Sequence, residues 1–293
     1  KNKIYVITPK NNEEYHFMNR QILSLLIVTL FITGCNQQTE EPTKPKFKRP
    51  IGPYGLPYRV GNLGGKPVLL GEEASDLEYE DSPVLNPENR RKGYKPPPRN
   101  FDSIITAFGF EMKYPTGLVL VRYHKAPQDA SKQYDAERDM ADSQWVHVIV
   151  SAGRRYSYKS NLTAAFINST LDTKVSSLKN IQENHYISIY IPSNKQEHGL
   201  EKHIPHPEWI NFYEYKETKD LYIQKNEQGK VTTLIRCSNK DVAPARTCFM
   251  QWVMEPEIKV LLNAHFKRVH LKDWQLIQKQ SEKIIKSFIV QPK

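Results

Sequence analysis

Residues 108–123, with the sequence FGFEMKYPTGLVLVRY, decide the fold class. Large apolar or aromatic side chains alternate with small or polar ones at Phe108, Phe110, Met112 and Tyr114. This period of two is typical of a β-strand with one buried face. A turn at 115–117 and a second apolar run at 118–123 follow, which predicts a β-hairpin.

The chain beyond this hairpin is predicted to be mostly β. Residues 145–150, WVHVIV, are almost continuously apolar and predict a central strand. Further strands are predicted at 185–191, 210–216, 220–226, 231–237, 248–254 and 258–269, with a turn at 226–229. Residues 128–142 are polar and predict either a solvated helix or an excursion, and 161–180 have helical spacing.

The clearest helix is predicted at 274–288, where Asp273 can provide the N-cap. Its apolar side chains form one stripe at Trp274, Ile277, Ile284, Ile285 and Phe288. The whole pattern predicts an α+β fold, with antiparallel sheet and a C-terminal amphipathic helix.

Residues 51–100 differ from the rest, because glycine and proline recur throughout them. These residues break regular elements, and Pro96, Pro97 and Pro98 favour an extended backbone. Apolar side chains are interspersed among them. We therefore expect a long irregular N-terminal segment that is ordered and wraps over the main domain.

Residues 18–35, MNRQILSLLIVTLFITGC, have the features of a secretory signal. One cation precedes a short apolar run and a small-residue end, and the run is too short for a membrane-spanning helix of about 20 residues. The ending resembles a bacterial lipobox, which implies acylation of Cys35, and Asn36 after it favours the outer membrane. We expect residues 1–17 to be an extension from an over-called start codon.

The expected organisation follows from this signal. Residues 1–34 are the upstream extension and signal peptide. Residues 35–50 are polar and proline-punctuated, which predicts a flexible tether. Residues 51–293 form one globular domain, with two lobes at 51–195 and 196–293 as the alternative division.

The formal net charge is +10, and the excess is spread along the chain. Such a charge suits contact with anionic lipid or an acidic protein, or simple solubility. No stacking or groove-reading motif is present, so nucleic acid is not an expected partner.

Cys237 and Cys248 are the only cysteines after Cys35. They flank a ten-residue loop between two predicted strands, in a chain expected to be secreted. Facing positions across a hairpin bring two cysteines within disulfide range. We predict a structural disulfide between them.

His198, His203 and His206 lie in one segment, but their spacing matches no known metal site. A solvated loop is the favoured interpretation, and no metal or cofactor is expected.

Nucleophilic motifs are also absent from the sequence. The glycines at 61–65 do not match a phosphate loop, and the acidic pairs at 72–73 and 80–81 suit a solvated surface. We do not expect an enzyme.

Tyrosines are frequent in the irregular segment, and tyrosine is enriched where proteins bind proteins. Tyr54, Tyr58 and Tyr79 are therefore candidate contacts for a partner. The alternative is that these rings only fix the segment to the sheet.

Three stretches together resemble a group of lipoproteins associated with type VI secretion loci: GPYGLPYRVGNLGGKPVLLG at 52–71, YEDSP at 79–83 and KPPPRNFDSIITAFGFEMKYPTG at 95–117. Members of that group are similar to immunity proteins encoded beside secreted lipase-type effectors. The resemblance implies a periplasmic lipoprotein, tethered to the outer membrane, that binds a secreted phospholipase-type toxin and blocks its active site. The alternative function is a structural or assembly lipoprotein of a secretion or cell-wall system.

Overall fold

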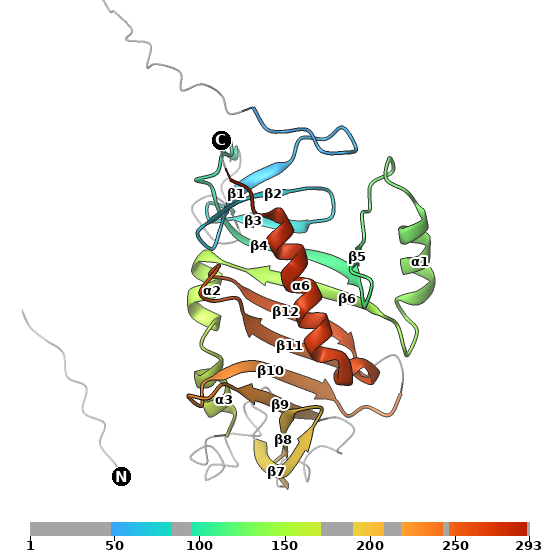
Figure 1. Cartoon of the computed structure of the whole chain (residues 1–293), viewed down its shortest axis with the longest axis vertical. Coiled ribbons are helices and arrows are strands. Elements are labelled where there is room, and N and C mark those ends of the chain that lie inside the picture. The colour runs from blue at the N-terminus through green and yellow to red at the C-terminus, as the bar shows by residue number, and fades with distance from the viewer. Residues whose placement is uncertain (1–47, 84–94, 171–189, 208–217, 243–245, 292–293) are drawn as a thin grey trace, which may run out of the picture. The chain divides into compact units, whose positions relative to one another are not determined.

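The computed structural model describes residues 48–83, 95–170, 190–207, 218–242 and 246–291 (Figure 1). All of these lie in one compact unit, Phe47–Lys293. The predicted signal, the acylation site Cys35 and nearly all of the tether lie outside the described residues. None of the helices in the described part of the chain is long and apolar enough to cross a membrane.

Twelve strands of the described chain form a single sheet in the order β2-β1-β4-β6-β12-β11-β10-β9-β8-β7, with β3 and β5 also paired to β4. The strands are β1 Arg59–Leu63, β2 Lys66–Leu70, β3 Ser75–Tyr79, β4 Ile104–Lys113, β5 Leu118–Val119, β6 Trp145–Ser151, β7 Tyr190–Glu197, β8 Leu200–Pro205, β9 Lys219–Lys225, β10 Val231–Ser238, β11 Thr247–Val253 and β12 Leu261–Lys267. Among these strands, β1 and β4 are the one parallel pair, and the other pairings are antiparallel. The predicted α+β class with antiparallel sheet is confirmed.

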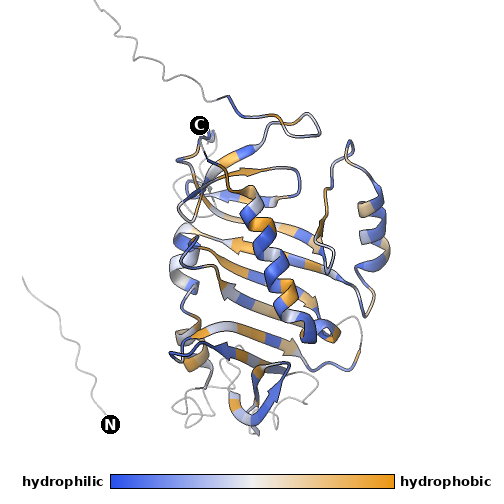
Figure 2. Cartoon of the chain, in the orientation of Figure 1, coloured by the Kyte–Doolittle hydropathy of each residue, from blue (hydrophilic) through white to orange (hydrophobic). Residues whose placement is uncertain are grey.

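The described helices are α1 Asp129–Glu137, α2 Gly153–Lys159, α3 Leu162–Thr170 and α6 Trp274–Phe288, with a 3-10 helix η4 at Arg268–Asp273. Helix α6 lies across one face of the sheet (Figure 1), and Figure 2 shows hydrophobic and hydrophilic segments alternating along it. Its predicted apolar stripe is buried, and the polar Ser281 is buried on the same helix. Asp273 does occupy the N-cap position, but its side chain makes no capping hydrogen bond; its carboxylate instead accepts one from the Tyr114 hydroxyl at 3.2 Å.

The main core lies between α6 and the sheet. The Phe288 ring meets Phe108 and Phe110 of β4 edge-on, with ring centroids 5.9 and 6.4 Å apart. Such contacts add to the free energy of burial. A smaller apolar cluster, which includes Leu162, Leu221 and Leu234, lies under α3 on the opposite face.

The expectation of an irregular segment is wrong for three stretches of it: β1 and β2 form a hairpin over 59–70, and β3 at 75–79 pairs with β4. Gly64 and Gly65 form the β1–β2 turn with φ of +55° and +94°, which glycine adopts at little cost. Gly61 lies inside β1, where a Cβ atom would come within 2.6 Å of the Ile105 side chain. These glycines therefore permit a tight turn and a close strand approach. The rest of the described segment, outside β1, β2 and β3, is irregular as predicted.

Most of the other predicted elements are present. The 108–123 hairpin is formed by β4 and β5, although β5 has only two residues. Residues 128–142 contain a helix, α1, with no buried side chain. Helix α3 occupies Leu162–Thr170 of the helix predicted at 161–180. The remainder of that prediction, residues 171–180, lies outside the described residues, as does the predicted strand at 210–216.

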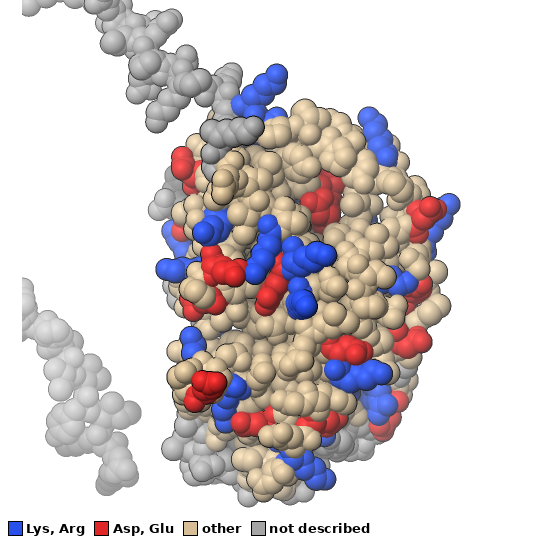
Figure 3. Space-filling view, viewed as in Figure 1, with Lys and Arg blue, Asp and Glu red and all other residues tan. Residues whose placement is uncertain are grey.

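Charges of both signs are interspersed on the α6 face of the molecule (Figure 3). No single-sign patch dominates this view. The positive excess of the sequence is therefore not concentrated around α6.

Candidate functional site

The chain entering the domain, residues 50–58, is closed into a small loop by its own backbone. Gly52 N–H donates to Leu56 O at 2.7 Å, and Tyr58 N–H donates to Pro50 O at 2.9 Å. Ile51 and Pro57 form an isolated antiparallel bridge. These bonds close the loop within the chain itself, and Tyr54 and Tyr58 both lie on this closed loop.

Tyr54 and Tyr58 line a cavity of about 50 Å³, which we name the Tyr54–Tyr58 hollow. Its walls are Gly52, Pro53, Tyr54, Leu56, Pro57, Tyr58, Gly71, Glu72 and Glu73. The loop supplies the apolar and aromatic walls, and the turn between β2 and β3 supplies the two carboxylates. Both tyrosine rings are half-buried.

The acidic wall of the hollow is held in place by local bonds. Glu73 accepts a hydrogen bond from Gly71 N–H at 3.1 Å. The Arg59 guanidinium donates to the carbonyls of Gly71 and Ala74. At Gly71 a Cβ atom would lie 2.4 Å from a Glu73 oxygen, so a side chain there would displace the Glu73 carboxylate from its present position. The acidic pair at 72–73, predicted to be solvated surface, thus lies beside two of the predicted contact tyrosines.

Further aromatic rings extend the surface from the hollow towards α1. The rings of Tyr54 and Tyr123 lie 6.4 Å apart, and Tyr123 contacts His124 at 4.4 Å. The Arg122 guanidinium lies 4.6 Å from the ring centre of Tyr134 on α1. The aromatic surface is thus wider than the three tyrosines indicated by the sequence.

Tyr79 lies apart from the hollow, on β3, and its polar and aromatic groups have partners within the chain. Its hydroxyl donates to Val60 O at 2.8 Å, and the Arg99 guanidinium lies 4.0 Å from its ring centre. Burial raises the pKa of the Tyr79 hydroxyl, although nearby arginines oppose this. Tyr79 therefore joins β3 to β1, whereas Tyr54 and Tyr58 share one cavity.

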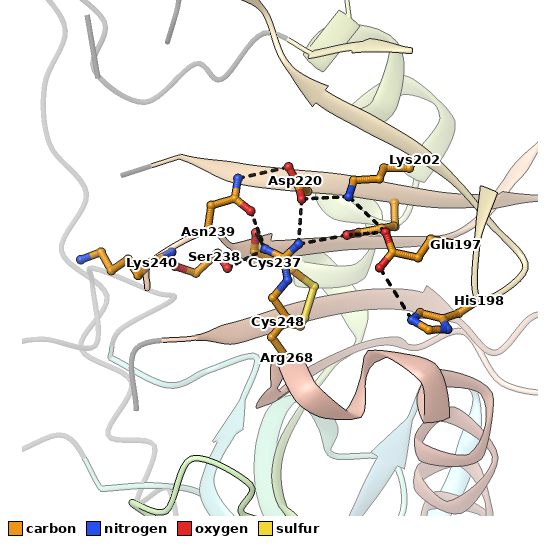
Figure 4. Close-up of a disulfide and its surroundings, with 11 residues drawn as sticks. Glu197, His198, Lys202, Asp220, Cys237, Ser238, Asn239, Lys240, Cys248 and Arg268 are labelled. Carbon is orange, nitrogen blue, oxygen red and sulfur yellow. Dashed lines mark hydrogen bonds and ion pairs between the residues drawn. A yellow bond between two sulfur atoms is a disulfide. The ribbon is translucent and has the colours of Figure 1, made fainter. Parts of the chain in front are cut away.

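Cys237 and Cys248 are joined by a disulfide in the structure (Figure 4). They face each other on β10 and β11, with Cα atoms 4.0 Å apart, and both are buried. The disulfide joins the end of β10 to the start of β11, next to the loop that connects the two strands.

A charge network surrounds this disulfide, with the fully buried Asp220 at its centre (Figure 4). Arg268 donates to the Asp220 carboxylate at 2.7 Å and to Ser238 O at 2.7 Å. Lys202 lies 3.4 Å from Asp220. Burial alone would lower the pKa of Lys202, but the hydrogen bond to Glu197 and the charge of Asp220 outweigh it and raise that pKa. The network therefore connects β8, β9 and η4 to the disulfide hairpin.

Reduction of the disulfide is expected to lower the free energy of unfolding by about 2–3 kcal/mol, because a loop of this length gains that much unfolded-state entropy when it opens. Urea denaturation with and without reductant measures the loss, and the Cys237→Ser/Cys248→Ser double variant should match the reduced protein. Intact mass should also rise by about two hydrogens on reduction. Alkylation of both Cys237 and Cys248 in the native, unreduced chain would contradict the disulfide.

The interpretation of the histidine segment as a solvated loop is wrong for His203, whereas His198 does lie exposed in a turn. Residues 190–205 form the β7–β8 hairpin, and His203 is only 5% exposed on β8. Its ring packs against Phe166 of α3 at 5.1 Å, and burial lowers its pKa. Burial rather than ligation therefore explains His203. No group of three or more metal-ligating side chains occurs in the described residues.

The acidic pair at 80–81 forms surface ion pairs. Glu80 lies 2.9 Å from Arg154, and Asp81 lies 2.8 Å from Arg99. Both carboxylates are partly exposed, which agrees with the predicted solvated surface.

The comparisons with known proteins give no family for this chain. No protein-family model matches it, and no curated protein matches it. Its fold is similar to that of an immunity protein of the Stenotrophomonas maltophilia type IV secretion system, with 13% identity, 81% of this chain and 96% of that chain covered, and a TM-score of 0.46. It is also similar to the iron-regulated outer membrane lipoprotein FrpD of Neisseria meningitidis, with 11% identity, 85% and 99% coverage, and a TM-score of 0.32. The function is therefore argued from this chain's own residues.

Proposed function

We propose that this chain is an immunity lipoprotein, anchored by Cys35 on the periplasmic side of the cell envelope, that binds and neutralises a secreted toxin. The resemblance of residues 52–117 to lipoproteins of type VI secretion loci supports a type VI effector of the phospholipase type as the toxin. The alternative, a structural or assembly lipoprotein of the envelope, predicts no binding to such a toxin.

The observation that carries this proposal is the Tyr54–Tyr58 hollow on its closed loop. An inhibitor must dissociate slowly, and a few well-packed aromatic anchors contribute more to slow dissociation than contact area does. Tyrosine offers a large amphipathic surface with only two side-chain torsions to fix. Because backbone bonds already close the loop, little ordering entropy would be lost on binding.

The carboxylates beside the rings add a preference for charge. Glu72 and Glu73 line the same cavity as the two tyrosines. Negative charge beside aromatic faces favours a cationic side chain, which both groups attract. We therefore expect the toxin to place a lysine or arginine against this hollow.

Single alanine variants of the three tyrosines test the contact. Tyr54→Ala and Tyr58→Ala are each expected to raise the Kd for the toxin encoded beside the gene by about thirtyfold, the effect of losing an aromatic anchor of about 2 kcal/mol. Their melting temperatures should change little. Tyr79→Ala should instead lower the melting temperature, because its ring and hydroxyl contact Arg99 and Val60.

Calorimetric titration of the full chain with the toxin measures the affinities, and thermal unfolding of the same samples measures stability. Unchanged affinity in all three variants, with a loss of stability, would make the segment structural and place the interface elsewhere. Absence of binding by the wild-type chain would overturn the proposed function itself.

Acylation of Cys35 is expected to place the protein in the membrane fraction. Metabolic labelling with a clickable fatty acid should mark the wild-type protein and leave Cys35→Ser unlabelled. The Cys35→Ser protein should also lose its association with outer membranes. Equal labelling of the two proteins would rule out Cys35 as the lipid anchor.

A further inference from the structure

The face of the sheet opposite α6 carries a straight row of five side chains, one from each of five adjacent strands. Met112 contacts α6, and side chains alternate along a strand, so Glu111 points to the other face. The strand register then aligns Glu111 of β4 with His147 of β6, His265 of β12, Phe249 of β11 and Arg236 of β10. We name these five residues the cross-strand row.

Neighbours along the row are in contact. His147 Nδ1 lies 2.8 Å from the Glu111 carboxylate. The rings of His147 and His265 are 6.1 Å apart, and those of His265 and Phe249 are 4.6 Å apart. With adjacent strands about 4.8 Å apart, the row is roughly 19 Å long, which is the length of a helix of about 13 residues.

Within the described part of the chain, all five side chains of the row have some solvent-exposed surface. His265 is exposed, and the other four side chains are half-buried. Helix α1 flanks one end, where the Tyr134 hydroxyl lies 3.5 Å from Glu111. Helix α3 flanks the other end, where Ser169 lies 3.4 Å from Arg236. The two helices thus bound the row without covering its centre.

The charged side chain at one end of the row has an ionisable partner, and the charged side chain at the other end does not have one among the described residues. Glu111 is paired with His147, and that hydrogen bond raises the pKa of the histidine. Burial, followed by the charge of His147, lowers the pKa of His265, so the middle of the row favours a neutral ring. Among the described residues, Arg236 donates to the neutral oxygens of Gln251 and Ser169, each at 3.4 Å. Within the described residues, Arg236 has no carboxylate partner.

A half-buried guanidinium without a carboxylate partner has N–H groups ready to donate to one. Its planar fork binds carboxylates in a bidentate way, and arginine beside an aromatic ring is a common centre of protein interfaces. Gln251, which accepts from Arg236, donates in turn to Asn263 at 2.9 Å, so a hydrogen-bonded chain of side chains orients the guanidinium.

We propose that the cross-strand row is a second contact surface for the toxin, and that it takes an acidic segment of the toxin. A carboxylate of that segment pairs with Arg236, and an adjacent apolar or aromatic side chain packs on Phe249 and His265. This inference rests on the proposed function and gives the toxin two charge requirements: a cationic group at the Tyr54–Tyr58 hollow and an acidic group at the row.

Affinity of the full chain for the toxin encoded beside the gene tests the proposal. Arg236→Gln is expected to raise the Kd by about tenfold to a hundredfold, as for loss of hydrogen bonds to a charged group. Phe249→Ala should weaken binding as well. Arg236→Lys, which keeps the charge but not the fork, should lie between Arg236→Gln and the wild type. The wild-type affinity should fall with added salt, and that dependence should be weaker in Arg236→Gln.

The matched control is Arg154→Gln, because the exposed Arg154 already has Glu80 as its partner. This variant should bind like the wild type. Wild-type binding with unchanged affinity in both Arg236→Gln and Phe249→Ala would overturn the proposal while leaving the proposed function intact. Failure of the wild type to bind would overturn both. If Arg236→Gln does not fold, the folded Arg236→Lys variant takes its place. The proposal would be overturned if this variant bound the toxin as tightly as the wild type does and if added salt did not change its affinity.

Discussion

Replacement of Arg268 by methionine is expected to lower the free energy of unfolding by about 3–5 kcal/mol, because it removes the main partner of a buried charge. Asp220 is fully buried, and Arg268 lies 2.7 Å from its carboxylate. Methionine keeps an unbranched apolar side chain in place of the aliphatic part of arginine, but it carries no charge. The same guanidinium also donates to the Ser238 carbonyl of the disulfide hairpin.

Urea denaturation of the full chain measures this effect, with Arg246→Met as the matched control. Arg246 is about half exposed and lies 3.8 Å from an exposed Asp241. Exposed ion pairs contribute about 0–1 kcal/mol, so the control should be close to the wild type. Equal stability of the two variants would mean that the other partners of Asp220, among them Lys202 and Asn239, compensate its charge without Arg268.

Trp252→Ala is expected to lower the free energy of unfolding by about 3–5 kcal/mol, because Trp252 is the largest fully buried side chain among the described residues. Trp252 lies on β11 with no exposed surface, and its indole N–H donates to Glu282 of α6 at 3.1 Å. The substitution therefore removes both the packing and a bond between the sheet and α6.

Trp252→Phe separates the two contributions, since it keeps an aromatic ring in the core and loses the hydrogen bond. Trp252→Phe should lower the free energy of unfolding by less than half as much as Trp252→Ala does. Thermal or urea unfolding of both variants measures the difference. A loss below about 1 kcal/mol for Trp252→Ala, the size of an average substitution, would contradict the described packing of α6 on the sheet.

The sequence predicted those elements whose signal is local. The 108–123 hairpin and the helix at 274–288 follow from periodicity within one short window. The β1–β2 hairpin was missed because Gly64 and Gly65 give the same local signal in a loop and in a tight turn. What makes Gly61 a strand residue is its contact with Ile105, far along the chain, which no local pattern contains.

The candidate site was predictable to a similar extent. Tyr54 and Tyr58 were identified from composition, but their common cavity depends on the β2–β3 turn that carries Glu72 and Glu73. The cross-strand row was missed because alternation within a strand does not determine its register with the next. The strand at 145–150 is almost continuously apolar in sequence, apart from His147. This one polar side chain was the available sign that the strand has a face outside the apolar core.

The central claim is that this chain neutralises a toxin by occupying its surface. The most direct test measures the catalytic activity of the proposed toxin, the one encoded beside the gene, on its own substrate, while the full chain is added stepwise. We predict that activity falls in proportion to added protein and is abolished near equimolar amounts, and that the Tyr54→Ala/Arg236→Gln variant requires a large excess. Full toxin activity in the presence of excess wild-type protein would contradict the account.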